Sequence, residues 1–162
     1  MKISRYEKDL SLEQIEVLEK YIGLNIPQDY VKHLLQYNGG KPAPNIFRFY
    51  RNNGEFDGSD LDWFLAIYNG EYDNLKTYID IYKKNDKRLP SHIFPIAHDS
   101  GGNLICISCG VDDYGYIYFW DHENEVDYSV SDDSDYSNLH LIAKSFKKFI
   151  DGLMTLEEFE NS

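Results

Sequence analysis

Cysteine is scarce in this sequence. The 162 residues contain only two, Cys106 and Cys109, which are too few for a disulfide framework and are typical of a protein from a reducing compartment. Their C-x-x-C spacing matches a redox pair, but such pairs sit at a helix N-terminus, whereas these residues fall in an expected strand. A second pair of ligands, which a structural zinc site needs, is also missing. We therefore expect structural thiols, with no metal and no other cofactor.

Long hydrophobic runs are absent as well. No apolar segment approaches the roughly 20 residues that span a bilayer. Residues 1–9 carry too many charges to begin a signal peptide. We therefore expect a soluble, cytoplasmic protein without a membrane partner.

Positive charge is missing from one third of the chain. Between Leu89 and Ala143 there are ten Asp and Glu residues and no Lys or Arg, so this segment carries −10 of the formal net charge of −12. Nucleic acids and anionic membranes need a basic surface, so neither is an expected direct partner. Two interpretations remain: the segment binds a basic protein, or it is a solvated acidic surface that only keeps the protein soluble.

The chain does contain enough apolar material for a folded core. Hydrophobic residues make up 42% and aromatic residues 15% of the sequence, which is far from the composition of a disordered chain. No repeat or linker interrupts it, so we expect a single domain over residues 1–162. Folding at this length removes about 70% of the unfolded chain's surface from water.

Helical signals occur near both ends and in the middle of the chain. Ser11-Leu12-Glu13-Gln14 is a capping box, and Asn38-Gly39-Gly40 is expected to end the second helix with a left-handed glycine. Residues 75–82 and 144–153 have apolar stripes with helical spacing. The basic cluster Lys83–Arg88 follows the third helix, where cations favour the helix dipole; a binding patch is the alternative interpretation.

Strand signals dominate the centre of the sequence. Residues 116–121 are apolar or aromatic on both faces, which predicts a central strand covered on both sides. The turn Asp99-Ser100-Gly101-Gly102-Asn103 separates two apolar segments and predicts an antiparallel pair. The other expected strands are 45–51, 61–68, 93–98 and 103–109, with a weak edge strand at 125–130, whereas 52–60 and 131–138 are expected to be polar turns.

Four phrases in the sequence carry a resemblance to a known family. They are Ile22 to Tyr30 with Asn38-Gly39-Gly40, Phe94 to Asp99 with Gly102-Asn103, Ile117 to Glu123, and Ile142 to Phe146 with Phe149. In this order they resemble the SUKH superfamily, which covers bacterial immunity proteins and the fungal Smi/Knr cell-wall regulators. The resemblance spans roughly residues 10–153. It implies an α+β fold with a central, mostly antiparallel sheet of about five or six strands and helices packed on it.

The resemblance also implies a function without catalysis. Many bacterial members look like immunity proteins that bind and neutralise a polymorphic toxin, often a nuclease. Combined with the charge distribution, this predicts a stoichiometric inhibitor whose acidic surface meets a basic toxin, with no catalytic residue and with the oligomeric state open. The residues expected to bind the partner are Asp121, Glu123, Glu125, Asp127, Asp132, Asp133 and Asp135, with Tyr128 and Tyr136 as exposed aromatic anchors.

Two alternatives have a different chemistry. One is a regulatory or scaffold interaction domain, as in the fungal relatives. The other is a metal-dependent hydrolase, because His and Asp are suitable ligands. Adjacent residues of a strand point in opposite directions, however, so neighbouring His and Asp residues need a bend to chelate one ion. The residues considered for this metal site are His98, Asp99, Asp121, His122 and His140.

Overall fold

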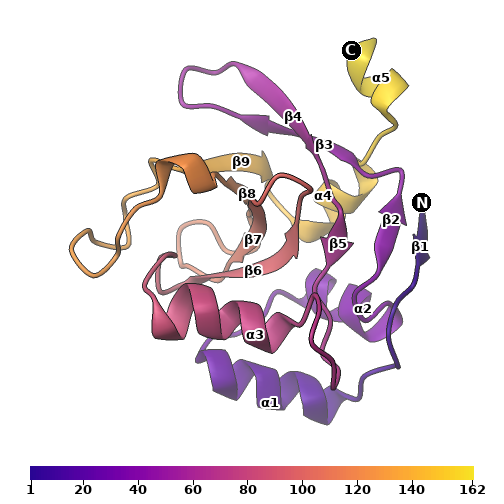
Figure 1. Cartoon of the computed structure of the whole chain (residues 1–162), viewed down its shortest axis with the longest axis vertical. Coiled ribbons are helices and arrows are strands. Elements are labelled where there is room, and N and C mark those ends of the chain that lie inside the picture. Colours follow the sequence, from indigo (N-terminus) through magenta and orange to yellow (C-terminus); the bar gives the residue numbers. More distant parts are fainter.

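A curled antiparallel sheet organises the computed structural model, which describes residues 1–162 (Figure 1). Its strand order is β4-β3-β9-β8-β7-β6-β5. The strands are β3 (Ile46–Tyr50), β4 (Phe56–Asp60), β5 (Trp63–Phe64), β6 (Ile93–His98), β7 (Leu104–Ser108), β8 (Ile117–Trp120) and β9 (Leu139–Ala143), while β1 (Lys2–Ser4) and β2 (Lys41–Ala43) form a separate pair. The expected antiparallel α+β fold is confirmed, with seven strands in the main sheet where about five or six were predicted.

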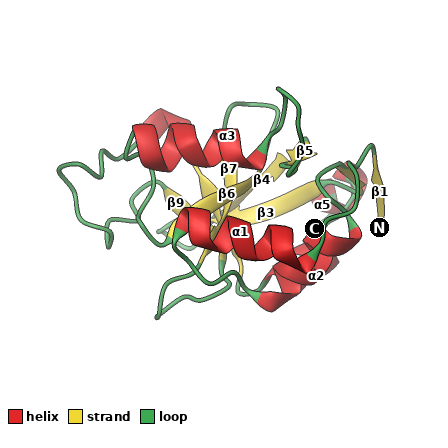
Figure 2. Ribbon diagram, turned by 90° about the horizontal axis from the view of Figure 1, so that it is seen from below, coloured by secondary structure: helices red, strands yellow, loops and turns green.

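Five α-helices accompany the sheet, and the first three lie in front of the strands in the view of Figure 2. They are α1 (Leu12–Ile22), α2 (Gln28–Gln36), α3 (Leu75–Ile79), which continues into the π-helical segment η1 (Asp80–Asn85), α4 (Phe146–Asp151) and α5 (Leu156–Glu160); a 3-10 turn, η2 (His122–Asn124), follows β8. The capping box predicted at Ser11 is present, because its hydroxyl accepts from the Gln14 N–H at 3.3 Å and its own N–H donates to Gln14 Oε1 at 3.0 Å. None of these helices is long and apolar enough to cross a membrane.

Strand β8 is buried on both faces, as its sequence predicts. Ile117 and Phe119 belong to the larger of two apolar clusters, and Tyr118 and Trp120 belong to the smaller one. On the second side the Tyr82 ring of η1 meets the edge of Trp120, with ring centroids 5.4 Å apart. The helix that ends in the basic cluster therefore covers this face of the sheet.

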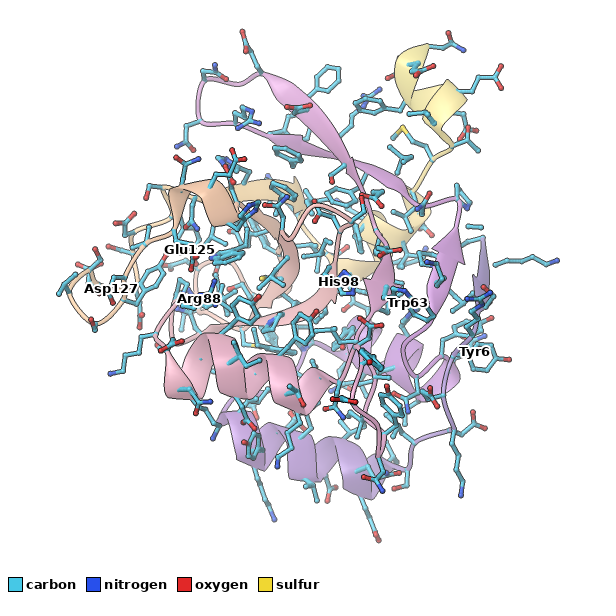
Figure 3. All side chains as sticks on the ribbon, viewed as in Figure 1. Tyr6, Trp63, Arg88, His98, Glu125 and Asp127 are labelled. Atoms are coloured by element: carbon cyan, nitrogen blue, oxygen red, sulfur yellow. The ribbon has the colours of Figure 1, made fainter.

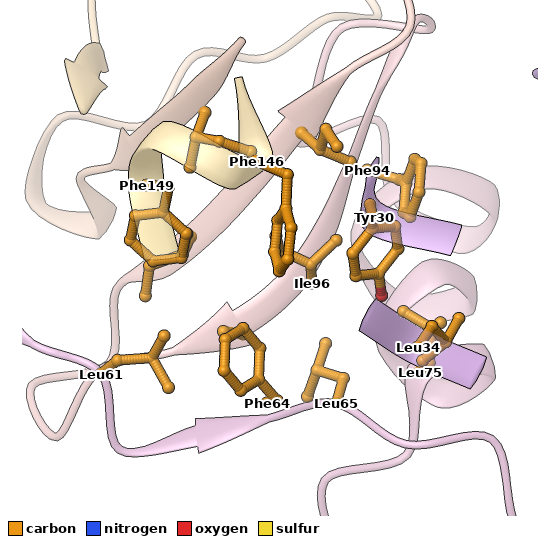
Figure 4. Close-up of a cluster of buried hydrophobic side chains, with 14 of the residues drawn as sticks. Tyr30, Leu34, Leu61, Phe64, Leu65, Leu75, Phe94, Ile96, Phe146 and Phe149 are labelled. Atoms are coloured by element: carbon orange, nitrogen blue, oxygen red, sulfur yellow. The ribbon is translucent and has the colours of Figure 1, made fainter. Parts of the chain in front are cut away.

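Aromatic side chains link the helices to the larger cluster (Figure 4). Tyr30 of α2 packs against Phe146 of α4 at 5.1 Å and against Phe94 of β6 at 6.2 Å between ring centroids. All three are buried. Burial of a side chain of this size stabilises the fold by about 2 kcal/mol, so this contact fixes two helices on the sheet.

A carboxylate shapes the hairpin between β6 and β7. Asp99 Oδ1 accepts from the backbone N–H groups of Gly101 at 2.9 Å and Asn103 at 2.8 Å. Its Oδ2 accepts from the Asn103 amide and from the Ser59 hydroxyl, both at 2.8 Å. The predicted turn is therefore confirmed, and the antiparallel register runs from Ile93 opposite Ser108 to His98 opposite Leu104.

Six strand assignments differ from the sequence-based expectation, and two of them are β1 and β2, which were not foreseen. Residues 56–60 form β4, although 52–60 was expected to be a turn, because an edge strand can remain polar while its backbone pairs with β3. Only Trp63 and Phe64 of the segment 61–68 are in a strand. Residues 125–130 form no strand, and β9 was not foreseen because it follows a polar loop directly.

The glycines after α2 have a different role from the one expected. The helix ends at Gln36 and its cap residue Tyr37 is extended, with φ −135°. Gly39 has φ +80°, and a Cβ there would lie 2.6 Å from the Ala66 Cβ. Glycine is needed because the chain passes close to residue 66, not because it caps the helix.

This close approach gives the first prediction. Gly39→Ala should destabilise the protein by about 3 kcal/mol, because it adds a clash to the strain of a left-handed backbone. The matched control is Gly23→Ala, at φ +71° with no atom within 4 Å of the added Cβ, which should cost only about 1 kcal/mol. Urea unfolding of both variants measures the difference, and equal losses would show that the contact with Ala66 has no energetic weight.

Candidate functional site

The seven acidic residues predicted to bind a partner lie on one segment, residues 121–138, here called the acidic loop. It connects β8 to β9 and projects from the end of the sheet, at the left of Figure 1. Its two ends are joined, because the Asp121 N–H donates to the Asn138 carbonyl at 3.0 Å and the Asn138 amide donates to the Asp121 carbonyl at 3.2 Å. The acids are therefore gathered on one closed loop.

Three Asp-x-Ser triplets give the acidic loop its local shape. In each, the Asp carboxylate accepts from the backbone N–H of the Ser two residues later, at 2.9, 2.8 and 3.0 Å in chain order. In the first two triplets the Ser hydroxyl donates to the same carboxylate. The triplets are Asp127-Tyr128-Ser129, Asp132-Asp133-Ser134 and Asp135-Tyr136-Ser137. Such short turns replace the edge strand expected in this region.

These hydrogen bonds also keep the carboxylates ionised. Donation by the Ser hydroxyl and then by the Ser backbone N–H lowers the pKa of Asp127 and Asp132 below the ordinary Asp value, and hydrogen bonding by Ser137 lowers that of Asp135. The three side chains therefore carry full negative charge at neutral pH.

Three contacts attach the acidic loop to the chain that follows η1. Arg88 donates two hydrogen bonds to Glu125, Nε to Oε1 at 2.6 Å and a terminal nitrogen to Oε2 at 2.9 Å (Figure 3). The Ser91 N–H donates to Asp133 at 2.9 Å, and the Tyr128 N–H donates to the Lys87 carbonyl at 2.9 Å. Glu125 and Asp133 are thus already engaged inside the molecule.

The expectation that Tyr128 is an exposed anchor is wrong. Its side chain is only 8% exposed, and its hydroxyl donates to the Asp135 carbonyl. Tyr136 is half-buried, where its ring stacks on His92 and its hydroxyl donates to Asp113 at 2.7 Å. Both rings hold the loop in place, because each points its hydroxyl inward. A direct role in partner binding stays a prediction for these two residues and for the seven acids.

The structure adds a buried carboxylate that the sequence did not single out. Asp113, in the turn between β7 and β8, accepts from the hydroxyls of Ser108 at 2.6 Å, Tyr118 at 2.7 Å and Tyr136 at 2.7 Å. Burial raises its pKa, but the three hydroxyl donors outweigh burial and leave the pKa below its usual value. In the sequence, the alternation of Tyr116, Tyr118 and Trp120 indicated that these side chains share one face of the strand. Nothing in the sequence indicated that Asp113 contacts this face.

The basic cluster Lys83–Arg88, which begins in the last turn of η1, serves the structure at two positions at least. Lys83 Nζ donates to the carbonyls of Pro90 at 3.2 Å and Ser91 at 2.9 Å, and burial lowers its pKa to about 8. The Arg88 guanidinium lies 4.4 Å from the centroid of the Tyr82 ring and pairs with Glu125. Lys83 and Arg88 therefore fit the interpretation of this cluster as a helix end that binds its own chain.

The residues considered for a metal site point to separate partners. His98 Nε2 contacts Asp73 at 2.5 Å, and the Asp99 carboxylate is occupied by the hairpin turn. His122 contacts Asn103 at 2.6 Å, and the ring of His140 faces Phe49. No group of three or more His, Cys, Asp or Glu side chains is arranged to hold an ion. The five residues are therefore not arranged to bind one metal ion together.

The two cysteines are free thiols at the end of a buried strand. Cys106 lies within β7 and is buried, and Cys109 follows the strand. Burial raises the pKa of both thiols, that of Cys109 to about 12. A thiol that remains protonated is a poor nucleophile and a poor metal ligand, which fits the expectation of structural cysteines.

Comparison with known proteins gives the family. Residues 9–152 match the model of the SMI1 / KNR4 family (SUKH-1). The chain is also 32% identical, over 165 residues, to the SPbeta prophage-derived uncharacterized protein YokK of Bacillus subtilis (strain 168), covering 93% of this chain and 78% of that protein. The chain therefore belongs to the SMI1/KNR4 (SUKH-1) family, as its four sequence phrases indicated. Members of this family are generally immunity or interaction proteins rather than enzymes.

The ion pair that anchors the acidic loop gives the second prediction. A double-mutant cycle with Arg88→Met and Glu125→Gln should return a coupling free energy of about 1 kcal/mol, because the pair is bidentate and only about a third exposed. The matched control is the exposed pair Lys147–Asp151 within α4, for which about 0.3 kcal/mol is expected. Urea unfolding of the seven proteins, the shared parent and three variants for each pair, measures both cycles, and an equal coupling in the two pairs would contradict the anchoring role.

The lowered pKa values in the acidic loop give the third prediction. A carboxyl group whose folded pKa is depressed stabilises the fold fully above its unfolded pKa, near 3.8, and loses that contribution as the pH falls through the folded pKa. The triple variant Ser129→Ala, Ser134→Ala and Ser137→Ala should therefore be less stable than the parent at pH 7. The difference should shrink as the pH falls below about 4. Urea unfolding midpoints of parent and variant, measured from pH 7 to below about 4, test this prediction. A difference in stability that does not depend on pH would show that the serines stabilise the turns without acting through the carboxylate charge.

Proposed function

We propose that this protein is a cytoplasmic immunity protein that binds and neutralises a basic toxin, with a nuclease as the leading candidate. The observation that carries the proposal is the acidic loop, which gathers seven carboxylates without a Lys or Arg. Membership of a family of immunity and interaction proteins supports it. The relative encoded by a prophage supports it further, because that protein belongs to a mobile element.

Charge complementarity explains how the acidic loop would act. A nuclease holds phosphates with basic side chains, so a surface of fixed carboxylates mimics its polyanionic substrate. The electrostatic field of such a surface raises the rate of encounter between the two proteins by about 10- to 1000-fold at low salt. Three of the carboxylates are bound only within their own triplets, so they remain free to meet a cationic partner; they are Asp127, Asp132 and Asp135.

The decisive experiment uses the products of the genes that flank the gene for this chain, one of which is expected to encode the toxin. The toxin domain is co-expressed with the protein, and both binding and rescue of growth are measured. The variant Asp127→Asn, Asp132→Asn and Asp135→Asn should weaken binding at least about tenfold and reduce rescue, because it removes three charges from the contact surface. The loss should be larger at low salt than at high salt.

The control variant changes the net charge equally at a distance from the acidic loop. Glu16→Gln, Glu55→Gln and Glu160→Gln neutralise three exposed carboxylates on α1, on the β3–β4 turn and on α5. This variant should bind the toxin like the parent. If both triple variants bind equally well, the acidic loop is not the contact surface; if the parent neither binds nor protects, the immunity proposal is wrong and a regulatory or scaffold role takes its place.

A further inference from the structure

A surface hollow of about 480 Å³ lies between the β7–β8 turn and the acidic loop. Among its lining residues Asp113 and Tyr118 are buried, Tyr136 is half-buried, and Asp112 and Asp133 are exposed. We therefore call Asp113 its floor, the two tyrosines its walls and the two exposed acids its rim. We call it the Asp113 hollow. No Lys or Arg lines it, and His92 is the only lining side chain that can become positive. The hollow is therefore an open, negatively charged recess next to the proposed contact surface.

No Lys or Arg is paired with the charge on the floor, and among the lining residues only His92, whose Nε2 contacts the Tyr136 hydroxyl at 2.5 Å, can become positive beside it. Asp113 is 8% exposed, and its three hydrogen-bond donors are neutral hydroxyls. Hydroxyl donors stabilise a carboxylate without cancelling its charge, and an ionised group at this depth gains most from a cation placed beside it. Glu125 of the acidic loop differs, since it is already paired with Arg88.

The walls are rigid aromatic surfaces. Tyr118 and Tyr136 meet edge to face with ring centroids 5.3 Å apart, and His92 stacks on Tyr136 at 5.9 Å. An aromatic wall beside a carboxylate favours a flat cation, because a guanidinium can lie against a ring while it donates to the carboxylate. A lysine ammonium lacks this flat face and is more strongly hydrated.

Glycine at position 110 keeps this arrangement close-packed. A Cβ on Gly110 would lie 2.6 Å from His92 Cδ2 and 2.8 Å from Asp113 Oδ1. Its backbone has no positive φ, so the reason for glycine is space and not conformation. The neighbouring Val111 is fully exposed, which offers an apolar contact at the edge of the hollow. The recess thus combines a buried anion, aromatic walls and an exposed apolar rim.

From these features we infer that the Asp113 hollow binds an arginine side chain of the partner protein. This inference rests on the proposed function, in which the partner is basic, and it names the contact that gives the complex its specificity. Binding energy at protein interfaces concentrates in a few buried aromatic and arginine contacts, whereas exposed charges at the rim mostly affect the rate of encounter. The Asp113 hollow would supply the buried contact, and the acidic loop would supply the electrostatic attraction that raises the rate of encounter.

The direct test titrates the full chain with N-acetyl-arginine methylamide while its backbone amide and aromatic signals are followed by NMR. The neutral and nearly isosteric N-acetyl-citrulline methylamide is the control ligand. Arginine should shift the signals of residues 110–113 and of the Tyr118 and Tyr136 rings with saturation in the millimolar range, and citrulline should leave them unchanged. Asp112→Asn should raise the dissociation constant about threefold, because it removes one rim charge and leaves the hydrogen bonds of Asp113 intact. Glu16→Gln should not change it.

Each result has a defined meaning for the inference. Equal shifts with both ligands, or shifts confined to residues 127–137 of the acidic loop, would overturn it, because neither pattern requires a cation in the hollow. Once the toxin is in hand, the inference also predicts that Asp112→Asn and Val111→Ser together, which remove one rim charge and one apolar contact, weaken the complex at least about tenfold. If the toxin binds but this variant binds equally well, the hollow is not used and the immunity proposal survives. If arginine binds the hollow but no toxin binds the chain, the immunity proposal fails and the arginine site stands.

Discussion

The burial of β8 on both faces is the constraint on which the rest of this structure depends. A strand with Ile117 and Phe119 on one side and Tyr118 and Trp120 on the other must have an apolar layer above and below it. Helices α1, α2 and α4 contribute to one layer, and η1 with the chain after it contributes to the other. Because both faces are covered, the turns at the two ends of β8 are held in fixed positions on the surface.

Those two turns carry the polar chemistry of the molecule. The turn before β8 contributes Asp113, and the acidic loop begins directly after Trp120. Tyr118 connects them, because it stands on β8 and donates its hydroxyl to Asp113, to which Tyr136 of the acidic loop also donates. A change in the packing of β8 therefore moves the hollow and the loop together. The loop is held against this packed core, although the short 3-10 turn η2 is its only regular secondary structure.

Local patterns in the sequence predicted the centre of the fold well. The capping box at Ser11, the hairpin turn at Asp99 and the two-faced strand 116–121 each depend on neighbouring residues, so a single stretch of sequence contains the whole signal. The edge strand β4 was missed because its side chains are mostly polar and give no strand signal. It forms because its backbone pairs with β3. Apolar periodicity does not identify an edge strand, because one side of such a strand faces solvent.

The candidate site was predicted in part, for a physical reason. Charge is additive along the chain, so the absence of Lys and Arg marked residues 89–143 as an acidic segment, and the structure shows that residues 121–138 of this segment form one closed loop. Burial in a loop is not periodic, so Tyr128 was expected outside but lies inside. Asp113 gained its importance from Ser108, Tyr118 and Tyr136, which meet only in the folded chain. Composition can therefore locate a charged surface, whereas a recess within it requires coordinates.

Seven carboxylates on one short loop repel one another, and the structure shows how this cost is limited. One of the charges is paired inside the molecule, Glu125 with Arg88, and Asp133 accepts hydrogen bonds from Ser91. The three triplet carboxylates are held by serine donors that leave the charge in place. A loop that only promoted solubility would gain nothing from fixing each carboxylate so locally, because solubility depends on net charge and not on its position. A fixed pattern of charge is useful where another surface must match it, and that is why the arrangement favours recognition.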